Sequence, residues 1–183
     1  MIISISGMPG SGKSTVARLL AKKLGIRRYS MGDMRRELAR RKGLVLGELN
    51  KIGESEDWTD REVDDYQKRL GETEDNFVVE GRTSFFLIPK SFKVFLEVNP
   101  RTGAERIFRH MKEVDRNEGR FDSVEDLIAS LKKREESDRK RYLKYYKIDI
   151  TDRTQYDLIL DTTDLKPEQV VDKILEAISS SPA

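Results

Sequence analysis

The stretch that decides the fold is Gly7–Ser14, which reads G-M-P-G-S-G-K-S and matches the pattern G-x-x-x-x-G-K-[ST]. Its glycines let the backbone curl so that successive N–H groups point at phosphate oxygens, and the N-terminus of a following helix adds its dipole. In such a loop, Lys13 reaches the outer phosphates of ATP and the Ser14 hydroxyl binds Mg²⁺. An apolar run, Ile2–Ile5, precedes the loop and a helical stretch follows it. The pattern therefore predicts a P-loop, with ATP contacts from Gly7, Met8, Pro9, Gly10, Ser11, Gly12, Lys13, Ser14 and Thr15.

Short apolar runs alternate with helical stretches along the rest of the chain. The predicted strands are Ile2–Ile5, Arg28–Ser30, Phe77–Val79, Lys93–Val98 and Asp157–Leu160. The predicted helices begin at Gly12, Asp33, Thr59 (with Glu62 completing a capping box), Asn99-Pro100, Ser123 and Lys166-Pro167; the first three end at Leu24, Gly43 and Gly71. Strands that alternate with helices indicate an α/β fold of three layers, in which helices cover both faces of a parallel sheet.

Length and composition narrow the class of protein. The chain has 183 residues and a net charge of +2, which fits one domain, residues 1–183, and does not by itself indicate nucleic acid or membrane as a partner. The charge is uneven: Lys13–Lys42 carries a local +9 and Glu54–Asp75 a local −7. There is no cysteine and only one histidine, His110, so a cysteine nucleophile and a Cys/His metal site are excluded. We expect a cytoplasmic protein without a membrane span.

A P-loop alone does not identify the reaction, whereas the companion motifs of other P-loop proteins would. A GTPase switch needs D-x-x-G, which does not occur, and N-K-x-D, for which Asn50–Gly53 lacks the aspartate. A motor or remodelling ATPase would normally be longer and would carry a partner-facing arginine in a second subdomain. These exclusions favour a small-molecule kinase, whose chemistry requires positive charge and the exclusion of water rather than a covalent nucleophile.

Two places near predicted strand ends suit an anionic acceptor. Asp33 is expected to cap a helix, which places Arg36 one turn in at the carboxyl edge of the sheet. Glu80 and Arg82 follow the buried strand Phe77–Val79; a carboxylate at such a strand end is where Mg²⁺ and its waters are held. The alternatives are a surface arginine at position 36 and a carboxylate at position 80 that caps a local group.

The long helix from Ser123 carries a stripe that changes from apolar to charged on one face: Leu127, Leu131, Arg134, Asp138, Arg141 and Tyr145. Inward-facing charges are costly unless they are paired or bound, so these residues form either a structural ion cluster or the wall of a polar ligand site. Arg106 and Arg109 lie one turn apart near a polar stretch, Val114–Phe121. That stretch could close as a lid over phosphates, or the helix could simply be solvated.

These features together resemble the nucleoside monophosphate kinases, and among them the short, archaeal-type cytidylate (CMP/dCMP) kinases. The resemblance covers nearly the whole chain. Besides the P-loop, it rests on Gly32–Arg36 (G-D-x-x-R), Asp60–Gln67 (D-x-x-V-D-x-x-Q), Val78–Arg82 (V-V-E-G-R), Arg134–Arg141 (R-x-x-x-D-x-x-R), Tyr146–Ile150 and Tyr156–Thr163. It differs from bacterial relatives at Glu80, where they have aspartate, at Thr83-Ser84, and in lacking their large insert.

The resemblance implies a five-stranded parallel sheet with an NMP-binding segment at 33–72 and a short lid at about 109–122. It implies that ATP, with Mg²⁺ held by Ser14 and Glu80, phosphorylates CMP or dCMP in a monomeric enzyme that binds neither nucleic acid nor membrane. The residues around Asp161–Thr163 would border the adenine. The implied catalytic residues are Lys13, Arg36, Arg82, Arg106, Arg109 and Arg134. The implied NMP-binding residues are Asp33, Arg36, Arg82, Arg134, Asp138 and Arg141. Of these, Asp138 and Arg141 would read the cytosine edge. Another acceptor (UMP, AMP or a small alcohol) and a non-catalytic nucleotide-binding regulator remain alternatives.

Overall fold

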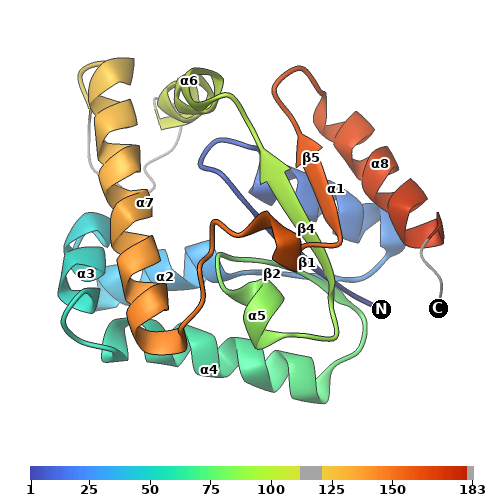
Figure 1. Cartoon of the computed structure of the whole chain (residues 1–183), viewed down its shortest axis with the longest axis horizontal. Coiled ribbons are helices and arrows are strands. Elements are labelled where there is room, and N and C mark those ends of the chain that lie inside the picture. Colours follow the sequence, from blue (N-terminus) through green and yellow to red (C-terminus); the bar gives the residue numbers. More distant parts are fainter. Residues whose placement is uncertain (112–120, 181–183) are drawn as a thin grey trace.

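The computed structural model describes residues 1–111 and 121–180 and has one parallel sheet at its centre (Figure 1). The strands lie in the order β2-β3-β1-β4-β5. Every pair of neighbours is parallel, and Ile5 of β1 is in register with Glu80 on one side and Val94 on the other. All carboxyl ends therefore meet at one edge. The strands are β1 (Ile2–Gly7), β2 (Arg27–Ser30), β3 (Phe77–Glu80), β4 (Phe92–Glu97) and β5 (Leu158–Asp161).

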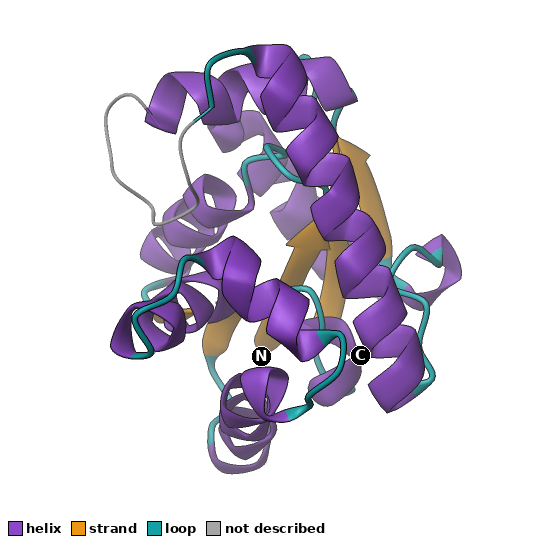
Figure 2. Cartoon of the chain, turned by 90° about the vertical axis from the view of Figure 1, so that its left-hand side faces the viewer, coloured by secondary structure: helices purple, strands orange, loops and turns teal. Residues whose placement is uncertain are grey.

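Helices surround the sheet, whose strands are seen between them in Figure 2. They are α1 (Lys13–Leu24), α2 (Met31–Arg41), α3 (Leu46–Gly53), α4 (Trp58–Thr73), α5 (Ser84–Leu87), α6 (Pro100–Met111), α7 (Val124–Tyr146) and α8 (Pro167–Ser180), with a 3₁₀ turn at Arg153–Gln155. The sequence-based fold class, a three-layer α/β fold with five parallel strands, is confirmed. None of these helices combines the length and the apolar composition that a membrane span requires.

The two faces of the sheet carry separate cores because side chains alternate along each strand. Ile3 and Ile5 pack with Leu20 of α1 and Ile174 of α8 on one face. On the other face, α2 and α4 cover β1 and β3, and a third cluster joins β4 to α5 and α7. The P-loop follows the central strand, between β3 and β4, which is the position where parallel sheets of this kind bind ligands.

The expected start of the second helix was wrong by one turn. Ser30, not Asp33, is the N-cap: its hydroxyl accepts a hydrogen bond of 3.3 Å from the Asp33 N–H. Ser30 ends β2, and a serine side chain caps a helix as well as an aspartate does, so the helix begins directly after the strand. Arg36 consequently lies a further turn into α2, yet it is still directed at the carboxyl edge of the sheet.

Both predicted ends of α4 were also wrong. The helix begins after Asp57, and Thr59 is buried in its first turn, where its hydroxyl donates to the Glu56 carbonyl at 3.3 Å. At the other end, Gly71 lies inside the helix. A Cβ at this glycine would lie 3.1 Å from the Ile88 side chain. Gly71 therefore allows close packing here and does not terminate the helix.

Two other predicted caps are confirmed. Asn99 Oδ1 accepts hydrogen bonds from the N–H groups of Arg101 (3.0 Å) and Thr102 (3.3 Å) at the start of α6. Ser123 caps α7 by accepting from Asp126 N–H at 3.1 Å. The expected lid at about 109–122 falls largely on residues 112–120, which lie outside the described part of the chain.

Candidate active site

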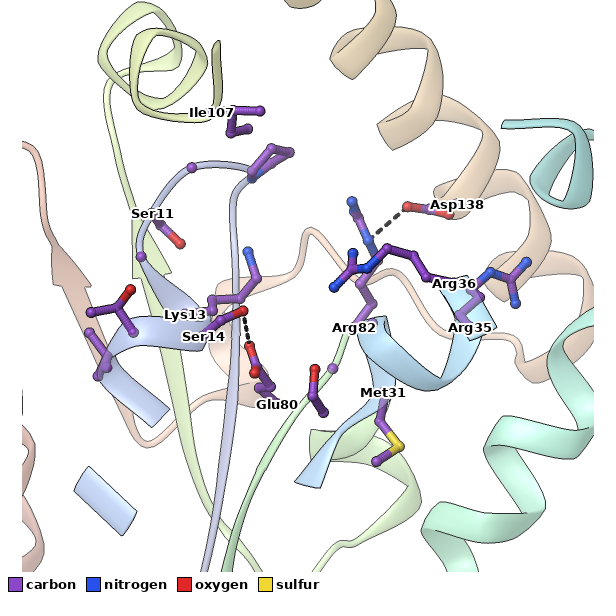
Figure 3. A pocket seen from close by; sticks show the side chains of 18 of the residues that line it. Ser11, Lys13, Ser14, Met31, Arg35, Arg36, Glu80, Arg82, Ile107 and Asp138 are labelled. Carbon is purple, nitrogen blue, oxygen red and sulfur yellow. Dashed lines mark hydrogen bonds and ion pairs between the residues drawn. The ribbon is translucent and has the colours of Figure 1, made fainter. Parts of the chain in front are cut away.

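A cavity of about 610 Å³ opens at the carboxyl edge of the sheet. The P-loop and α1 line one end, α2 and α4 the other, and β3, α6 and α7 lie between (Figure 3). Eight lysine and arginine side chains line it against four carboxylates. These cations are Lys13, Arg18, Arg28, Arg35, Arg36, Arg82, Arg106 and Arg134. A cavity of this size and charge suits phosphate-bearing ligands.

The P-loop backbone is held against two neighbouring segments. Gly7 has φ of 147° and Gly10 of 75°. A Cβ at Gly7 would lie 2.3 Å from the Leu96 carbonyl oxygen of β4, and one at Gly10 would lie 2.2 Å from the Gly103 carbonyl oxygen of α6. Only glycine fits at either position. The shape of the loop thus depends on close backbone contact with β4 and α6.

Lys13 lies at the centre of this loop. Its ammonium group donates to the carbonyl oxygens of Gly7 at 2.8 Å and Met8 at 2.7 Å. Burial, with the nearby positive charges of Arg82 and Arg134, lowers the pKa of Lys13 to about 7, against the smaller opposing effect of Glu80. A site that disfavours its own cation is one that an anion would stabilise. The environment of Lys13 is therefore electrostatically suited to bound phosphate.

Ser14 and Glu80, the two residues predicted to hold Mg²⁺, lie together in the structure. The Ser14 hydroxyl donates to Glu80 Oε2 at 2.7 Å, from α1 to the end of β3 (Figure 3). Arg28, which the sequence analysis missed, holds the other oxygen of the buried Glu80, with Nε 3.0 Å from Oε1. One hydroxyl and one carboxylate match the few protein oxygens that Mg²⁺ takes alongside phosphates and water. Within the described residues, no cluster of three or more Asp, Glu, His or Cys could hold a metal.

Three arginines predicted to bind the acceptor converge on the middle of the cavity. Arg36 is buried, and its Nη2 donates to Asp33 Oδ1 at 2.6 Å. Arg82 is held by Asp138, with Nε 2.8 Å from Oδ2. In Figure 3, Arg36 and Arg82 extend into the space between the P-loop and α7. Arg134 lines the same cavity from α7. Asp33 itself lies outside the lining and orients Arg36.

Arg141 lies behind the cavity and does not line it. Its side chain is completely buried, with Nη2 2.6 Å from Asp138 Oδ1 and Nε 3.1 Å from Asp60 Oδ2. Asp60 also pairs with Arg35, which lines the cavity. The charges thus alternate along one chain of contacts from Arg82 through Asp138, Arg141 and Asp60 to Arg35, named here the acceptor ion chain. The sequence left two interpretations open, a structural ion cluster and the wall of a ligand site. Arg141 belongs to the ion cluster alone, whereas Asp138 belongs both to the cluster and to the cavity wall.

The acceptor ion chain keeps Asp138 charged. Burial acts to raise the pKa of this carboxyl group, but the guanidinium groups of Arg82 and Arg141, with Arg134 beyond them, outweigh it and hold the pKa below its ordinary value. A buried carboxylate with two arginine partners is fixed in position. Asp138 therefore serves to orient Arg82 toward the cavity.

The two arginines predicted on α6 are placed differently. Arg106 lines the cavity, and its Nη2 donates to the carbonyl oxygens of Thr162 at 3.0 Å and Thr163 at 2.8 Å, in the loop after β5. Thr162 in turn donates to the Ser11 carbonyl at 3.0 Å, so this loop supports the P-loop. Arg109 is exposed and does not line the cavity.

Sequence reasoning assigned no role to several residues that line the cavity, although it included Asp60–Gln67 among the motifs of the resemblance. Asp60, Asp64 and Gln67 of α4 face the cavity, with Arg35 and Asn50 beside them. The signal was present, because positions 60, 64 and 67 are spaced i, i+4 and i+7 and share one helix face. A buried polar stripe on a helix is informative, since it requires partners.

Comparison with known proteins supports one family. Residues 2–164 match the model of the family described as "Cytidylate kinase-like family". Similar proteins include the cytidylate kinase of Archaeoglobus fulgidus, 39% identical over 97% of this chain and 94% of its own length. The cytidylate kinase of Natronomonas pharaonis is 40% identical over 98% of this chain and 90% of its own length. That of Sulfurisphaera tokodaii is 38% identical over 97% of this chain and 94% of its own length.

Solved structures agree on the fold. A protein of Eubacterium ventriosum described as uncharacterized superposes with a TM-score of 0.70 at 19% identity, covering 99% of both chains. The shikimate kinase of Bacteroides thetaiotaomicron gives a TM-score of 0.63 at 18% identity, covering 98% of both. At these identities the likeness concerns the architecture alone.

Proposed function

We propose, from the premise that this chain belongs to the cytidylate kinase-like family, that it transfers the γ-phosphoryl group of ATP to CMP or dCMP, giving the nucleoside diphosphate and ADP. The observation that carries the proposal is the single cavity in which the P-loop faces Arg36, Arg82 and Arg134. One chain supplies both the donor and the acceptor end, so we propose that the enzyme acts as a monomer.

In the transfer, an oxygen of the acceptor phosphate attacks the γ-phosphorus and the bond to the β–γ bridging oxygen breaks. The acceptor phosphate is already an anion at neutral pH, so this step requires no general base. What the protein supplies is position and positive charge. Lys13 would neutralise the β- and γ-oxygens, and Arg36, Arg82 and Arg134, which line the same cavity, would hold the acceptor phosphate in line.

The residues present fit Mg²⁺. Ser14 would bind the ion directly and Glu80 through water, with Arg28 keeping the Glu80 carboxylate in place. When bound, the ion neutralises charge on the triphosphate. Arg106 supports the donor end by fixing the loop at Thr162 and Thr163, the region that would border the adenine.

Phosphorus NMR of the full chain with ATP, Mg²⁺ and CMP tests the reaction itself. We expect the resonances of CDP and ADP to grow at equal rates, with little free phosphate, because the arginines would hold the acceptor phosphate, rather than water, in line with the γ-phosphorus. Release of inorganic phosphate without CDP would show an ATPase, and no change in the spectrum would show a non-catalytic nucleotide-binding protein. Either result would overturn the proposal.

A further inference from the structure

Besides the acceptor ion chain, a second line of polar contacts joins the two ends of the cavity. It runs from Ser14 through Glu80, Arg28 and Asp33 to Arg36 and is named here the donor–acceptor link. In the proposed function its two ends bind ligands, since Ser14 and Glu80 would hold Mg²⁺ and Arg36 the acceptor phosphate. The proposed function gives no role to the contact between Arg28 and Asp33 in the middle of the link.

Arg28 is shared between two carboxylates. Its Nε donates to Glu80 Oε1 at 3.0 Å, and its Nη2 donates to the same oxygen. Nη2 also donates to Asp33 Oδ2, at the longer distance of 3.4 Å. Because one nitrogen serves both carboxylates, a stronger contact with either of them weakens the other.

Asp33 is shared between two arginines. Its Oδ2 faces Arg28, and its Oδ1 accepts from Arg36 Nη2 at 2.6 Å. Burial acts to raise the pKa of Asp33, but the hydrogen bond and charge of Arg36, the Ser30 hydrogen bond and the charge of Arg28 outweigh it and lower the pKa. Asp33 is therefore an anion at neutral pH that attracts an arginine on either side.

The backbone holds the members of the link at fixed positions. β2 ends at Ser30, which lies opposite Glu80 of β3 in the parallel register, and α2 begins at Met31. Asp33 and Arg36 lie three positions apart on one face of that helix. Strand and helix follow each other without a loop, so a change in the link involves its side chains rather than the backbone.

The link is adjustable where the acceptor ion chain is fixed. In the acceptor ion chain, Arg141 lies completely buried between Asp60 and Asp138, and each carboxylate is bonded to its own nitrogen. In the link, both carboxylates draw on one nitrogen of Arg28, and the side chain of Asp33 is 60% exposed and not confined by packing. A shared contact beside an unconfined carboxylate can shift in response to a ligand at either end.

We propose that Arg28 and Asp33 couple the two ends of the cavity, so that a divalent ion held at Ser14 and Glu80 and a phosphate held at Arg36 each strengthen the binding of the other. Both are positioning residues, because Arg28 acts through Glu80 and Asp33 acts through Arg36. This inference rests on the proposed function and adds to it a reason for the ion and the acceptor to bind together.

A ligand at one end changes the contacts at the other. A cation beside Glu80 weakens the attraction of this carboxylate for Arg28, so the shared Nη2 turns toward Asp33. Asp33 then divides its charge between two arginines, which leaves the Arg36 guanidinium freer to bind a phosphate. In the other direction, a phosphate at Arg36 releases Asp33 toward Arg28, and Glu80 is freed for the cation. The two effects are equal, because coupling between binding equilibria is reciprocal.

The test measures binding without turnover, on the full chain saturated with ADP, which has no phosphoryl group to give to CMP in this reaction. Titration calorimetry gives the dissociation constant of CMP with Mn²⁺ and with EDTA. Electron paramagnetic resonance of Mn²⁺ gives the dissociation constant of the ion with and without CMP. Each pair of constants yields a ratio, the coupling factor, and reciprocity requires the two ratios to agree.

Three variants break the link, and one serves as the control. Arg28→Met removes the shared guanidinium, Asp33→Asn removes the charge between the two arginines, and the double variant removes both. The control is Arg27→Met, because Arg27 is the neighbouring arginine of β2, its side chain is 68% exposed, and its partner Glu74 lies outside the link.

For the wild type we expect a coupling factor of about tenfold, within the range usual for linked sites. Each single variant should lower it to below about threefold, the remainder being the direct attraction between the ion and the acceptor phosphate, which all variants keep. The double variant should lower it no further, because either substitution already interrupts the link. Arg27→Met should keep the factor of the wild type.

Several results would overturn the inference. A wild-type coupling factor of one, or a factor that Arg28→Met and Asp33→Asn leave unchanged, would give both residues a structural role only, and the proposed function would stand. An equal fall in Arg27→Met would show that the effect does not belong to the link. Absence of CMP binding to the wild type would overturn the proposed function as well. If Arg28→Met does not fold, judged by circular dichroism, the exposed Asp33→Asn decides alone.

Discussion

The two ends of the cavity are built in different ways. The donor end is one continuous loop, residues 7–15, whose shape depends on glycines packed against Leu96 and Gly103. The acceptor end is assembled from α2, α4, β3 and α7, and it is held by side-chain charges that pair across the acceptor ion chain. The donor end therefore depends on local sequence, and the acceptor end on tertiary packing. Damage to the first should affect catalysis, and damage to the second should affect folding as well.

The largest expected effect is at the donor end. Lys13→Ala should lower kcat/KM by about 1,000-fold or more, because it removes the positive charge nearest the transferring phosphoryl group. Stability should be unchanged or higher, since Lys13 is a partly buried cation whose pKa burial lowers. ADP release measures activity and urea unfolding measures stability. The control in both is Lys22→Ala, because Lys22 is an exposed lysine of the same helix. Substantial destabilisation by Lys13→Ala would contradict the comparison.

The acceptor ion chain should show the opposite behaviour. Arg141→Met leaves Asp60 and Asp138 buried with fewer partners, so the free energy of unfolding should fall by about 3 kcal/mol or more. Urea unfolding measures this. Arg139→Met, which breaks an exposed pair with Asp149, should cost less than about 1 kcal/mol. Equal effects of the two substitutions would show that the chain of charges does not stabilise the fold.

The affinity for ATP at the donor end should depend on pH through Lys13. With the pKa of Lys13 at about 7, the group is largely deprotonated at pH 8, and bound polyphosphate would raise its pKa. At pH 8, ATP binding to the wild type should therefore take up close to one proton more than ATP binding to Lys13→Met. The affinity of the wild type for ATP should fall up to tenfold per pH unit above pH 7. Titration calorimetry in two buffers of different ionisation enthalpy measures the uptake. Identical uptake by wild type and variant would refute the assignment.

The smallest effects are expected on α6. Arg106→Ala removes the hydrogen bonds to Thr162 and Thr163, so kcat/KM should fall about tenfold, mainly through a higher KM for ATP. Arg109→Ala should stay within threefold of the wild type, because its side chain is exposed and outside the cavity. Steady-state kinetics on both variants measures the difference. A larger loss in Arg109→Ala would restore the catalytic role that the sequence predicted for it.

The same contrast explains what could be predicted from the sequence. The P-loop between an apolar strand and a helix, and the five strands, follow from local patterns, and they agree with the structure. The starts of α2 and α4 did not follow. Ser30, three residues before Asp33, caps α2, and α4 begins after Asp57, two residues before Thr59. The end of a helix depends on packing as well as on the capping residue.

Side-chain partners across the fold were the least accessible to sequence analysis. The contact of Arg28 with Glu80 and the contact of Arg141 with Asp60 each join residues more than 50 positions apart. Helix periodicity placed Arg134, Asp138 and Arg141 on one face, but it could not show which of them reaches the cavity. The polar stripe of α4 can be seen in the sequence. Because buried polar groups need partners, this stripe could have been identified as part of a polar site.

The measurement that tests the central claim most directly is ADP release by the wild-type chain with ATP, Mg²⁺ and each of CMP, dCMP, UMP, AMP and GMP in parallel. The account predicts that kcat/KM is highest for CMP or dCMP and lower for UMP, AMP and GMP. Turnover highest with UMP, AMP or GMP, or none with all five, would contradict it.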